Sequence, residues 1–137
     1  WKQHLVAELE GQLDRSRLHF TGLLNHGDYI RMIQRSDLHV VFSRPYVTSW
    51  GLFQAAACGA RLLLNRTASS QAVLRDDQAF WADLDDPQAL SNTAAEALRV
   101  ALDQRKMPRQ SALRSEWELT NCLQRWHSLI NAQLQLD

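Results

Sequence analysis

The stretch SWGLFQAAACGARLLLN, residues 49–65, contains the residues whose types and spacing are best suited to holding a ligand. Residues 50–58 have the composition of a short helix, and Ser49 directly before them is a preferred N-cap residue. The first N–H groups of a helix lack partners inside it, and the helix dipole makes them attractive to a phosphate. The segment therefore suggests an anion site, although a well-packed helix with an ordinary serine cap is the commoner meaning of the same pattern.

The acidic segment DLDDP offers a second kind of chemistry. Asp83 and Asp85 have the Asp-x-Asp spacing of a divalent-cation site, but the following Asp86 and Pro87 form a typical N-cap and N1 pair. Carboxylates near a first helical turn also favour the helix dipole. The five histidines show no HxxxH or HExxH spacing, and the two cysteines lie far apart outside any CxxC pattern. We therefore interpret the acids as a helix start and expect no metal site.

The elements that must position these residues alternate between helix and strand. Apolar residues recur at helical spacing in residues 5–13 and 28–35, and continue in the segments 50–58, 70–74 and 87–104. Between them lie β-like runs at residues 17–22, 38–43, 61–65 and 79–83. This alternation predicts an α/β fold with a parallel sheet and helices on both faces.

The order of these elements gives the Ser49 helix a defined place. Residues 62–64 are three leucines without alternation, as expected for a strand buried on both faces of a parallel sheet. The alanines at 55–57 give the preceding helix a thin wall, and Gly59 stands where a helix commonly ends in a left-handed residue. The N-terminus of that helix is then expected above the carboxyl end of strand 38–43, where open α/β sheets bind ligands.

The charge balance and the length of the apolar runs limit the possible partners and the location of the protein. Lys and Arg (15) balance Asp and Glu (15), so neither nucleic acid nor an anionic membrane is an expected partner. No apolar run approaches the roughly 20 residues of a transmembrane helix, and we expect a cytoplasmic protein. We predict one domain, residues 1–137, whose C-terminal part, residues 109–137, carries an apolar stripe at helical spacing and packs back on the domain as a terminal helix.

Three segments together resemble a known family. They are RLHFTGLL, DYIRMIQRSDLHVVFSRPYVTSWGLFQAAACGARLLLN and FWADLDDPQAL, within about the first 100 residues. In order and spacing they are similar to the C-terminal, donor-binding domain of the retaining GT-B glycosyltransferases of family 4 (glycosyl transferases group 1), whose pattern includes EAMACGxPVV and DPxAL. The resemblance implies a Rossmann-like domain that holds a nucleotide-diphosphate sugar, and a hexosyltransferase-type activity that needs no metal or other cofactor.

The resemblance also assigns residues. It places Leu23 and Leu24 near the base, matches Ser43 to the serine of a Pro-Ser pair, and assigns the diphosphate to the amides of Ser49 and Trp50. The two glutamates of the family's E-x7-E pattern fall on Tyr46, at the catalytic position beside the transferred sugar, and on Gln54, at the ribose.

Both replacements change the expected chemistry. Gln54 keeps a carbonyl acceptor, so a ribose hydroxyl can still be bound through a neutral hydrogen bond. Tyr46 cannot supply a carboxylate charge at neutral pH. The family's diphosphate-binding Arg and Lys and two earlier strands have no counterpart here, so we expect a domain truncated at its N-terminus, part of a longer chain, with an uncovered sheet edge that favours self-association.

Two functions fit these patterns. The first is the donor-binding part of a glycosyltransferase that transfers a sugar, with retention, to an unknown glycan, lipid or protein acceptor bound by another domain, so that this fragment alone is inactive. The alternative is a GT-B-like interaction or binding module that has lost its chemistry. The sequence specifies neither the donor base and sugar nor the acceptor and linkage.

Overall fold

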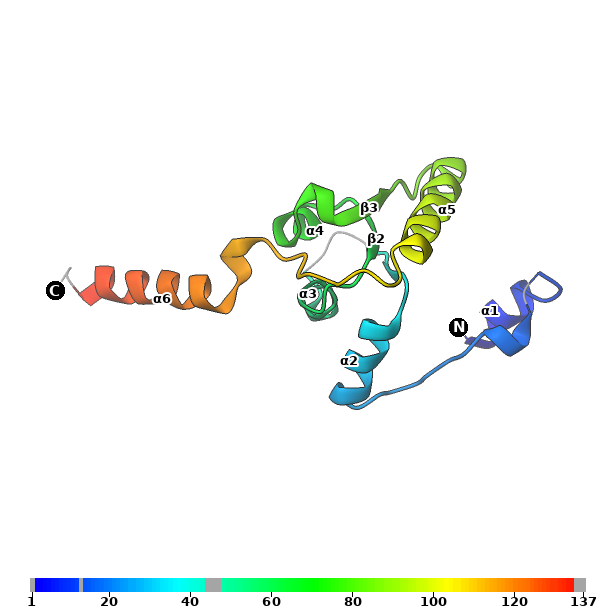
Figure 1. The fold of residues 1–137 in the computed structure, drawn as a ribbon, viewed down its shortest axis with the longest axis horizontal. Helices are drawn as coiled ribbons and strands as arrows, with labels where there is room; N and C mark the ends of the chain where they lie inside the picture. The colour runs from blue at the N-terminus through cyan, green and yellow to red at the C-terminus, as the bar shows by residue number, and fades with distance from the viewer. Residues whose placement is uncertain (1, 13, 44–47, 135–137) are drawn as a thin grey trace.

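The computed structural model describes residues 2–12, 14–43 and 48–134 and has a mixed α/β architecture (Figure 1). Its helices are α1 (Lys2–Glu8), α2 (His26–Arg35), α3 (Trp50–Ala57), α4 (Ala68–Val73), α5 (Pro87–Asp103) and α6 (Leu119–Leu134). Its strands are β1 (His39–Val41), β2 (Leu62–Asn65) and β3 (Ala79–Ala82). Short 3-10 turns are η1 (Arg15–Arg17), η2 (Asp76–Gln78) and η3 (Ser115–Trp117).

The three strands form one parallel sheet in the order β1-β2-β3. His39 is paired with Leu62, and Leu62 in turn with Ala79. The prediction that the strands within 38–43 and 61–65 are parallel neighbours is therefore confirmed, and the run at 79–83 supplies the third strand.

The central strand is buried on both faces, as its unbroken leucines predicted. Leu62, Leu63 and Leu64 expose 2% or less of their surface. Leu62 and Leu64 belong to a cluster with residues of α2, α3 and α4, whereas Leu63 packs with Ala97 of α5 on the other side. Helices therefore cover both faces of the sheet.

Helix α3 ends at the left-handed glycine that its sequence indicated. Gly59 has φ 66°. Its N–H donates to the Ala56 carbonyl and the Ala60 N–H donates to the Ala55 carbonyl, both at 3.0 Å. This pair of bonds is a Schellman motif. It turns the chain directly into β2, and it keeps the fully buried Ala55 and Ala56 against the sheet.

The β-like run RLHFTG does not form the strand that we predicted. Leu18 to Thr21 lie outside the sheet, in the connection that leads from η1 to α2 and away from the strands (Figure 1). The alternating pattern is real, since Leu18 and Phe20 are less exposed than His19, but a strand also needs a neighbour to take up its backbone hydrogen bonds. In the described sheet β1 is consequently an edge strand, and its middle residue, Val40, is half exposed.

The segment after α5 returns to the core. The Ala112 N–H donates to the Ala56 carbonyl at 2.9 Å, and the Arg114 N–H donates to the Val73 carbonyl at 3.0 Å. Trp117 places its ring edge-on to Phe53, with centroids 5.3 Å apart. Residues 109–117 thus lie against α3 and α4.

Helix α6 departs from the expectation that residues 109–137 pack back as a terminal helix. It extends away from the body in Figure 1 and leaves most of its apolar stripe exposed. The backbone and Trp117 contacts just described fix the chain only as far as η3, so the part that packs back is the segment before α6.

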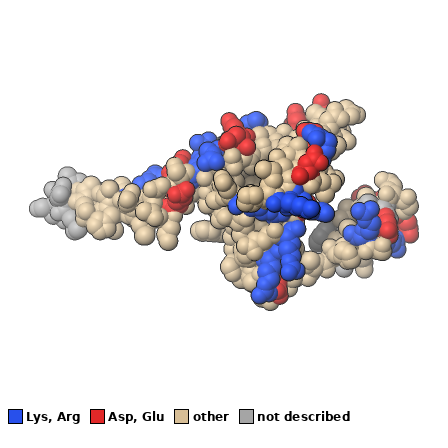
Figure 2. Space-filling model, viewed as in Figure 1, with Lys and Arg blue, Asp and Glu red and all other residues tan. Residues whose placement is uncertain are grey.

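Arginines of the 105–114 segment bind specific partners elsewhere in the chain. Arg105 Nε donates to Asp37 Oδ1 at 2.8 Å, and Arg109 Nη2 donates to the Ser36 carbonyl at 2.7 Å, at the C-terminal end of α2. Arg114 Nε donates to the carbonyls of Gln71 and Leu74. Figure 2 shows Lys and Arg side chains gathered over α2 and across the middle of the body. The bonds of Arg105, Arg109 and Arg114 hold the return segment, residues 105–117, against α2 and α4.

Candidate functional site

The N-terminus of α3 is the centre of the candidate site. Ser49 caps the helix, because its Oγ accepts from the Gly51 N–H at 3.1 Å. Within the described residues the N–H groups of Ser49 and Trp50 have no acceptor. The Trp50 side chain at this end of the helix is 82% exposed. The predicted cap is confirmed, and two donors remain available at the positive end of the helix dipole.

Gln54, one turn further along α3, meets the first residue of α2. Its Nε2 lies 3.2 Å from Nε2 of His26. An amide nitrogen can only donate, so this contact is a hydrogen bond to the tautomer of His26 whose Nε2 carries no proton. The Gln54 Oε1 then remains as an acceptor. His26 was missed from the sequence because only metal-type spacing was sought among the histidines, and its proximity to Gln54 across 28 residues has no local signal.

The starts of α2 and α3 also approach each other at Gly51. A Cβ built on Gly51 would lie 3.2 Å from the hydroxyl oxygen of Tyr29 and 3.3 Å from Oγ of Ser49. A side chain at this position would have to push one of them aside, so the glycine permits the close approach. We call the group Ser49, Trp50, Gln54, His26 and Tyr29 the helix-start site.

The Asn65 side chain joins the carboxyl end of β2 to the chain just after β1. Asn65 is the last residue of β2, and its Oδ1 accepts from the Ser43 N–H at 2.9 Å while its Nδ2 donates to the Ser43 carbonyl at 2.7 Å. The side-chain amide therefore replaces a neighbouring strand for one residue after β1. The sequence offered a weak signal for this role, an asparagine that closes an apolar strand.

A cavity of about 420 Å³ opens at the same edge of the sheet, at the carboxyl ends of β2 and β3. Asn65, Arg66 and Trp81 form one part of its lining and residues 82–85 the rest. The Arg66 guanidinium lies 4.9 Å from the Trp81 ring centroid and 3.5 Å from Asp76 Oδ1. Arg66, a cation directly after a buried strand, was also missed as a site residue.

The predicted site residues are brought together only in part. Ser49, Trp50 and Gln54 share the start of α3, and Leu24 is partly buried directly before Asn25, the N-cap of α2. Leu23 is fully exposed. Ser43 takes part through its backbone. Tyr46, the predicted catalytic position, lies outside the described residues.

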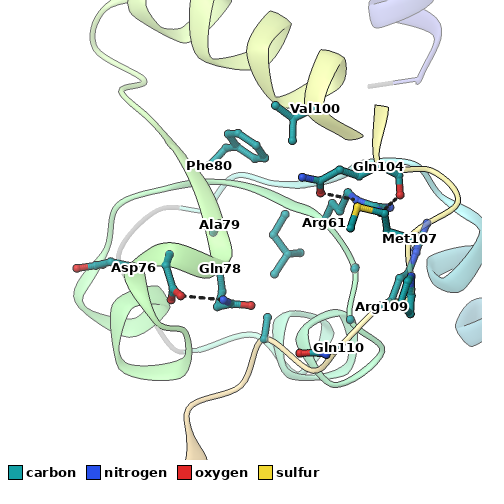
Figure 3. A pocket seen from close by; sticks show the side chains of 16 residues that line it. Arg61, Asp76, Gln78, Ala79, Phe80, Val100, Gln104, Met107, Arg109 and Gln110 are labelled. Atoms are coloured by element: carbon teal, nitrogen blue, oxygen red, sulfur yellow. Dashed lines mark hydrogen bonds between the residues drawn. The ribbon is translucent and has the colours of Figure 1, made fainter. Parts of the chain in front are cut away.

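A second cavity of about 420 Å³ lies at the opposite edge of the sheet, beside the amino ends of β2 and β3 (Figure 3). Arg61 Nε lies 3.4 Å from Gln104 Oε1, and Arg61 Nη1 is buried without an acceptor within the described part of the chain. Burial and, next, the Arg109 guanidinium lower the pKa of Arg61. This cavity is separate from the helix-start site, because it is lined by residues at the amino ends of the strands. Open parallel sheets bind ligands at the other end, beyond the carboxyl ends of their strands.

The acidic segment is a helix start. Asp86 caps α5, since its Oδ1 accepts from the N–H groups of Gln88 at 2.9 Å and Ala89 at 3.0 Å, and Pro87 opens the helix. Asp83 Oδ1 accepts from the Asp85 N–H. Among the residues that the structure describes, no three His, Cys, Asp or Glu side chains are grouped so that they could hold a metal ion.

Comparisons with known proteins leave the family open. No protein-family model, curated protein or solved structure matches the chain. Within the described ranges, none of the helices has both the length and the apolar character that crossing a membrane requires.

Proposed function

We propose that the chain is the donor-binding part of a retaining glycosyltransferase of the GT-B type, with a Rossmann-like sheet that holds a nucleotide-diphosphate sugar. The observation that supports it most is the start of α3. Two N–H groups without acceptors in the described chain follow the carboxyl end of β1, and Gln54 lies one turn behind them.

In this proposal the diphosphate lies against the start of α3. The amides of Ser49 and Trp50 donate to phosphate oxygens, and the helix dipole adds about 0.3 to 2 kcal/mol. Gln54 Oε1 accepts from a ribose hydroxyl, while the Nε2 of the same amide contacts His26. Nothing in the proposal calls for a metal or other cofactor.

The remaining assignments come from the resemblance. Leu23 and Leu24 would lie near the base, and Tyr46 near the transferred sugar. Ser43 would act through its position, since Asn65 holds its backbone where the chain leaves β1. The acceptor is bound by another part of the protein, because the chemistry of this class takes place between two domains.

A binding or interaction module is the second candidate. Gln54 stands where the family has a ribose-binding glutamate, and Tyr46 where it has a second one. The exposed apolar stripe of α6 and the free edge of β1 are surfaces that such a module would use.

Calorimetry with UDP, GDP and ADP on a protein that contains this chain together with its acceptor-binding domain tests the first candidate. Gln54→Ala should weaken nucleotide binding by about 0.5 to 1.5 kcal/mol, because one neutral hydrogen bond is lost. Gln54→Glu should bind equally well or more tightly through a charge-assisted bond. Gln34→Ala is the matched control, since Gln34 is exposed on α2.

Failure to bind any of the three nucleotides, or affinity that ignores both changes at Gln54, would reject the donor site. The interaction module would then be the better description of the chain.

A further inference from the structure

The cavity at the amino ends of β2 and β3 is bordered by a cation that lacks an acceptor. Arg61 lies directly before β2, its Nη2 donates to the Gln104 carbonyl, and its Nε lies 3.4 Å from Gln104 Oε1. Its Nη1 is buried and has no acceptor among the described residues. Buried polar groups in folded proteins are almost always hydrogen-bonded, and a charged donor is the costliest to leave unpaired. Arg61 Nη1 therefore needs an acceptor that the described chain does not supply.

Positive charge gathers on this side of the cavity. Burial and, next, the neighbouring Arg109 guanidinium lower the pKa of Arg61, whereas Asp37 raises it. Asp37 already receives two hydrogen bonds from Arg105. The hydrogen bonds that Arg109 makes go to two backbone carbonyls at the C-terminal end of α2. The hydrogen bonds of Arg61 and Arg109 in the described chain are thus all with neutral groups.

Two acidic residues also line the cavity, but each has a cation of its own. Asp76 Oδ1 lies 3.5 Å from Arg66 Nη1, and Asp77 Oδ1 lies 3.4 Å from Arg75 Nε. These carboxylates therefore do not serve as the acceptor that Arg61 Nη1 needs.

The size and the walls of the cavity suit a small organic molecule. Its volume of about 420 Å³ lies within the range of roughly 300 to 1,000 Å³ that is usual for ligand sites. Figure 3 shows Arg61 and Arg109 on one side of the cavity, and the apolar side chains of Phe80 and Val100 on other walls. A ligand that matches both kinds of wall has one anionic end and an apolar part.

A ligand reaches the buried Nη1 only when a neighbouring side chain moves. Met107 lines the cavity, and its N–H donates to the same Gln104 carbonyl that accepts from Arg61 Nη2. Met107 is 59% exposed, and its unbranched side chain adopts many conformations. It can therefore move aside without any change in the core.

We propose that this cavity binds a small organic anion. A carboxylate or phosphate oxygen of the ligand accepts from Arg61 Nη1 beside the Arg109 guanidinium, and the apolar part lies against Phe80 and Val100. Guanidinium groups form strong, charge-assisted hydrogen bonds with both kinds of anion. The site lies at the edge of the sheet opposite the helix-start site, so it does not depend on the proposed donor site.

Calorimetry on the chain with four probes tests this site and separates the two kinds of anion. The probes are inorganic phosphate, phenyl phosphate, acetate and phenylacetate, at an ionic strength of about 0.15 M so that weak surface attraction is screened. In the pair whose anionic group fits, we expect the phenyl compound to bind at least about tenfold more tightly than the small anion, because a ring is buried as well. The tighter of the two phenyl compounds identifies the anionic group. Binding of none of the four, or equal affinities within both pairs, would overturn the proposal.

Three substitutions of arginine by glutamine test the role of Arg61. Arg61→Gln should weaken binding of the tighter probe at least about tenfold, because a charge-assisted hydrogen bond is lost. Arg125→Gln, which removes the same charge from an exposed position on α6, should change the affinity less than about twofold. Arg66→Gln tests the cavity at the carboxyl ends of the strands. Binding that is lost in Arg66→Gln but kept in Arg61→Gln would reject the proposed site.

Nuclear magnetic resonance of the wild-type chain locates the probe without any substitution. The backbone amide signals of Gln78, Gln104 and Gln110, which line the cavity, should shift as the tighter probe is added. Shifts confined to Ser49 and Trp50 would place the probe at the helix-start site and contradict the proposal, even if Arg61→Gln fails to fold.

Discussion

The side chain of Asn65 binds both polar groups of the Ser43 backbone, one through its oxygen at 2.9 Å and one through its nitrogen at 2.7 Å. Ser43 lies two residues beyond the end of β1, and Asn65 ends β2. The two bonds therefore extend the pairing of these strands by one step, at the point where the chain leaves β1 for the start of α3. Asn65 therefore fixes the chain just beyond the end of β1.

Replacing Asn65 should lower stability according to the number of bonds lost. Asn65→Ala removes both, and at about 0.5 to 1.5 kcal/mol for each bond we expect a loss of about 1 to 3 kcal/mol. Asn65→Asp keeps the acceptor but turns the second contact into an oxygen–oxygen repulsion. Urea unfolding followed by circular dichroism measures both changes.

Asn92→Ala is the matched control for this prediction, because Asn92 is exposed on α5 and makes one side-chain bond, to Gln88. A loss in Asn65→Ala no larger than in Asn92→Ala would mean that the two bonds to Ser43 contribute nothing.

Gly59, in the turn after α3, can be compared with Gly22, which precedes α2 and is also left-handed. Gly59 has φ 66°, and a Cβ there would lie 2.7 Å from the Gln110 carbonyl oxygen. Gly22 has φ 64°, and a Cβ there would meet nothing within 4 Å. Gly22→Ala should cost about 1 to 2 kcal/mol for the left-handed conformation alone. Gly59→Ala should cost more, because the backbone of the return segment must also move. Thermal unfolding of both variants decides this, and equal losses would show that the contact with Gln110 is unimportant.

The region from α3 to β2 could be predicted because its signals are local. Three consecutive leucines indicate a strand buried on both faces, three alanines indicate a helix close to the sheet, and Gly59 marks the end of that helix. Each of these signals agrees with the others, and sequences that agree at several levels specify their structure well.

The two wrong predictions concern segments whose apolar residues are periodic but whose packing partner cannot be read from that periodicity. The alternation in RLHFTG shows which side chains would share a face, but not whether a neighbouring strand exists. The stripe of α6 shows that the helix needs cover, but not which surface supplies it. Periodicity describes one element at a time, whereas packing depends on two.

The site contacts between distant residues could not be predicted either. His26 and Gln54 are 28 residues apart, and Asn65 is 22 residues from Ser43. A polar side chain near the end of an element is compatible with solvent or with a partner, and only the folded chain decides between them. Ser49 was predictable because its cap bond spans two residues.

His39 in β1 should make the protein less stable in mild acid. Burial lowers its pKa from the ordinary 6.5, so below pH 6.5 the unfolded chain binds a proton that the folded chain resists. Stability then falls as the pH decreases from about 6.5 to the lowered pKa of the folded state. His39→Gln should flatten this dependence in urea unfolding between about pH 7.5 and pH 5, whereas the exposed His19→Gln should not. A variant at His39 with an unchanged pH dependence would contradict the assignment.

The Asp37–Arg105 pair should act in a lower pH range and in the same direction. Asp37 precedes β1, and its carboxylate receives two bonds from Arg105, which follows α5. The bond from Arg105 lowers the pKa of Asp37 from its ordinary 3.8. A carboxyl group with a lowered folded-state pKa adds stability that is fully present above pH 3.8 and is lost as the pH falls through the lowered value. Asp37→Asn should therefore be less stable than the wild type at neutral pH, and the two should converge in acid.

Asp103→Asn is the control, because it breaks an exposed pair with Arg99 within α5. We expect it to change stability less at neutral pH, since its pair connects residues of one helix only. A difference between wild type and Asp37→Asn that persists well below pH 3.8 would show that Asp37 acts through its shape and not through its charge.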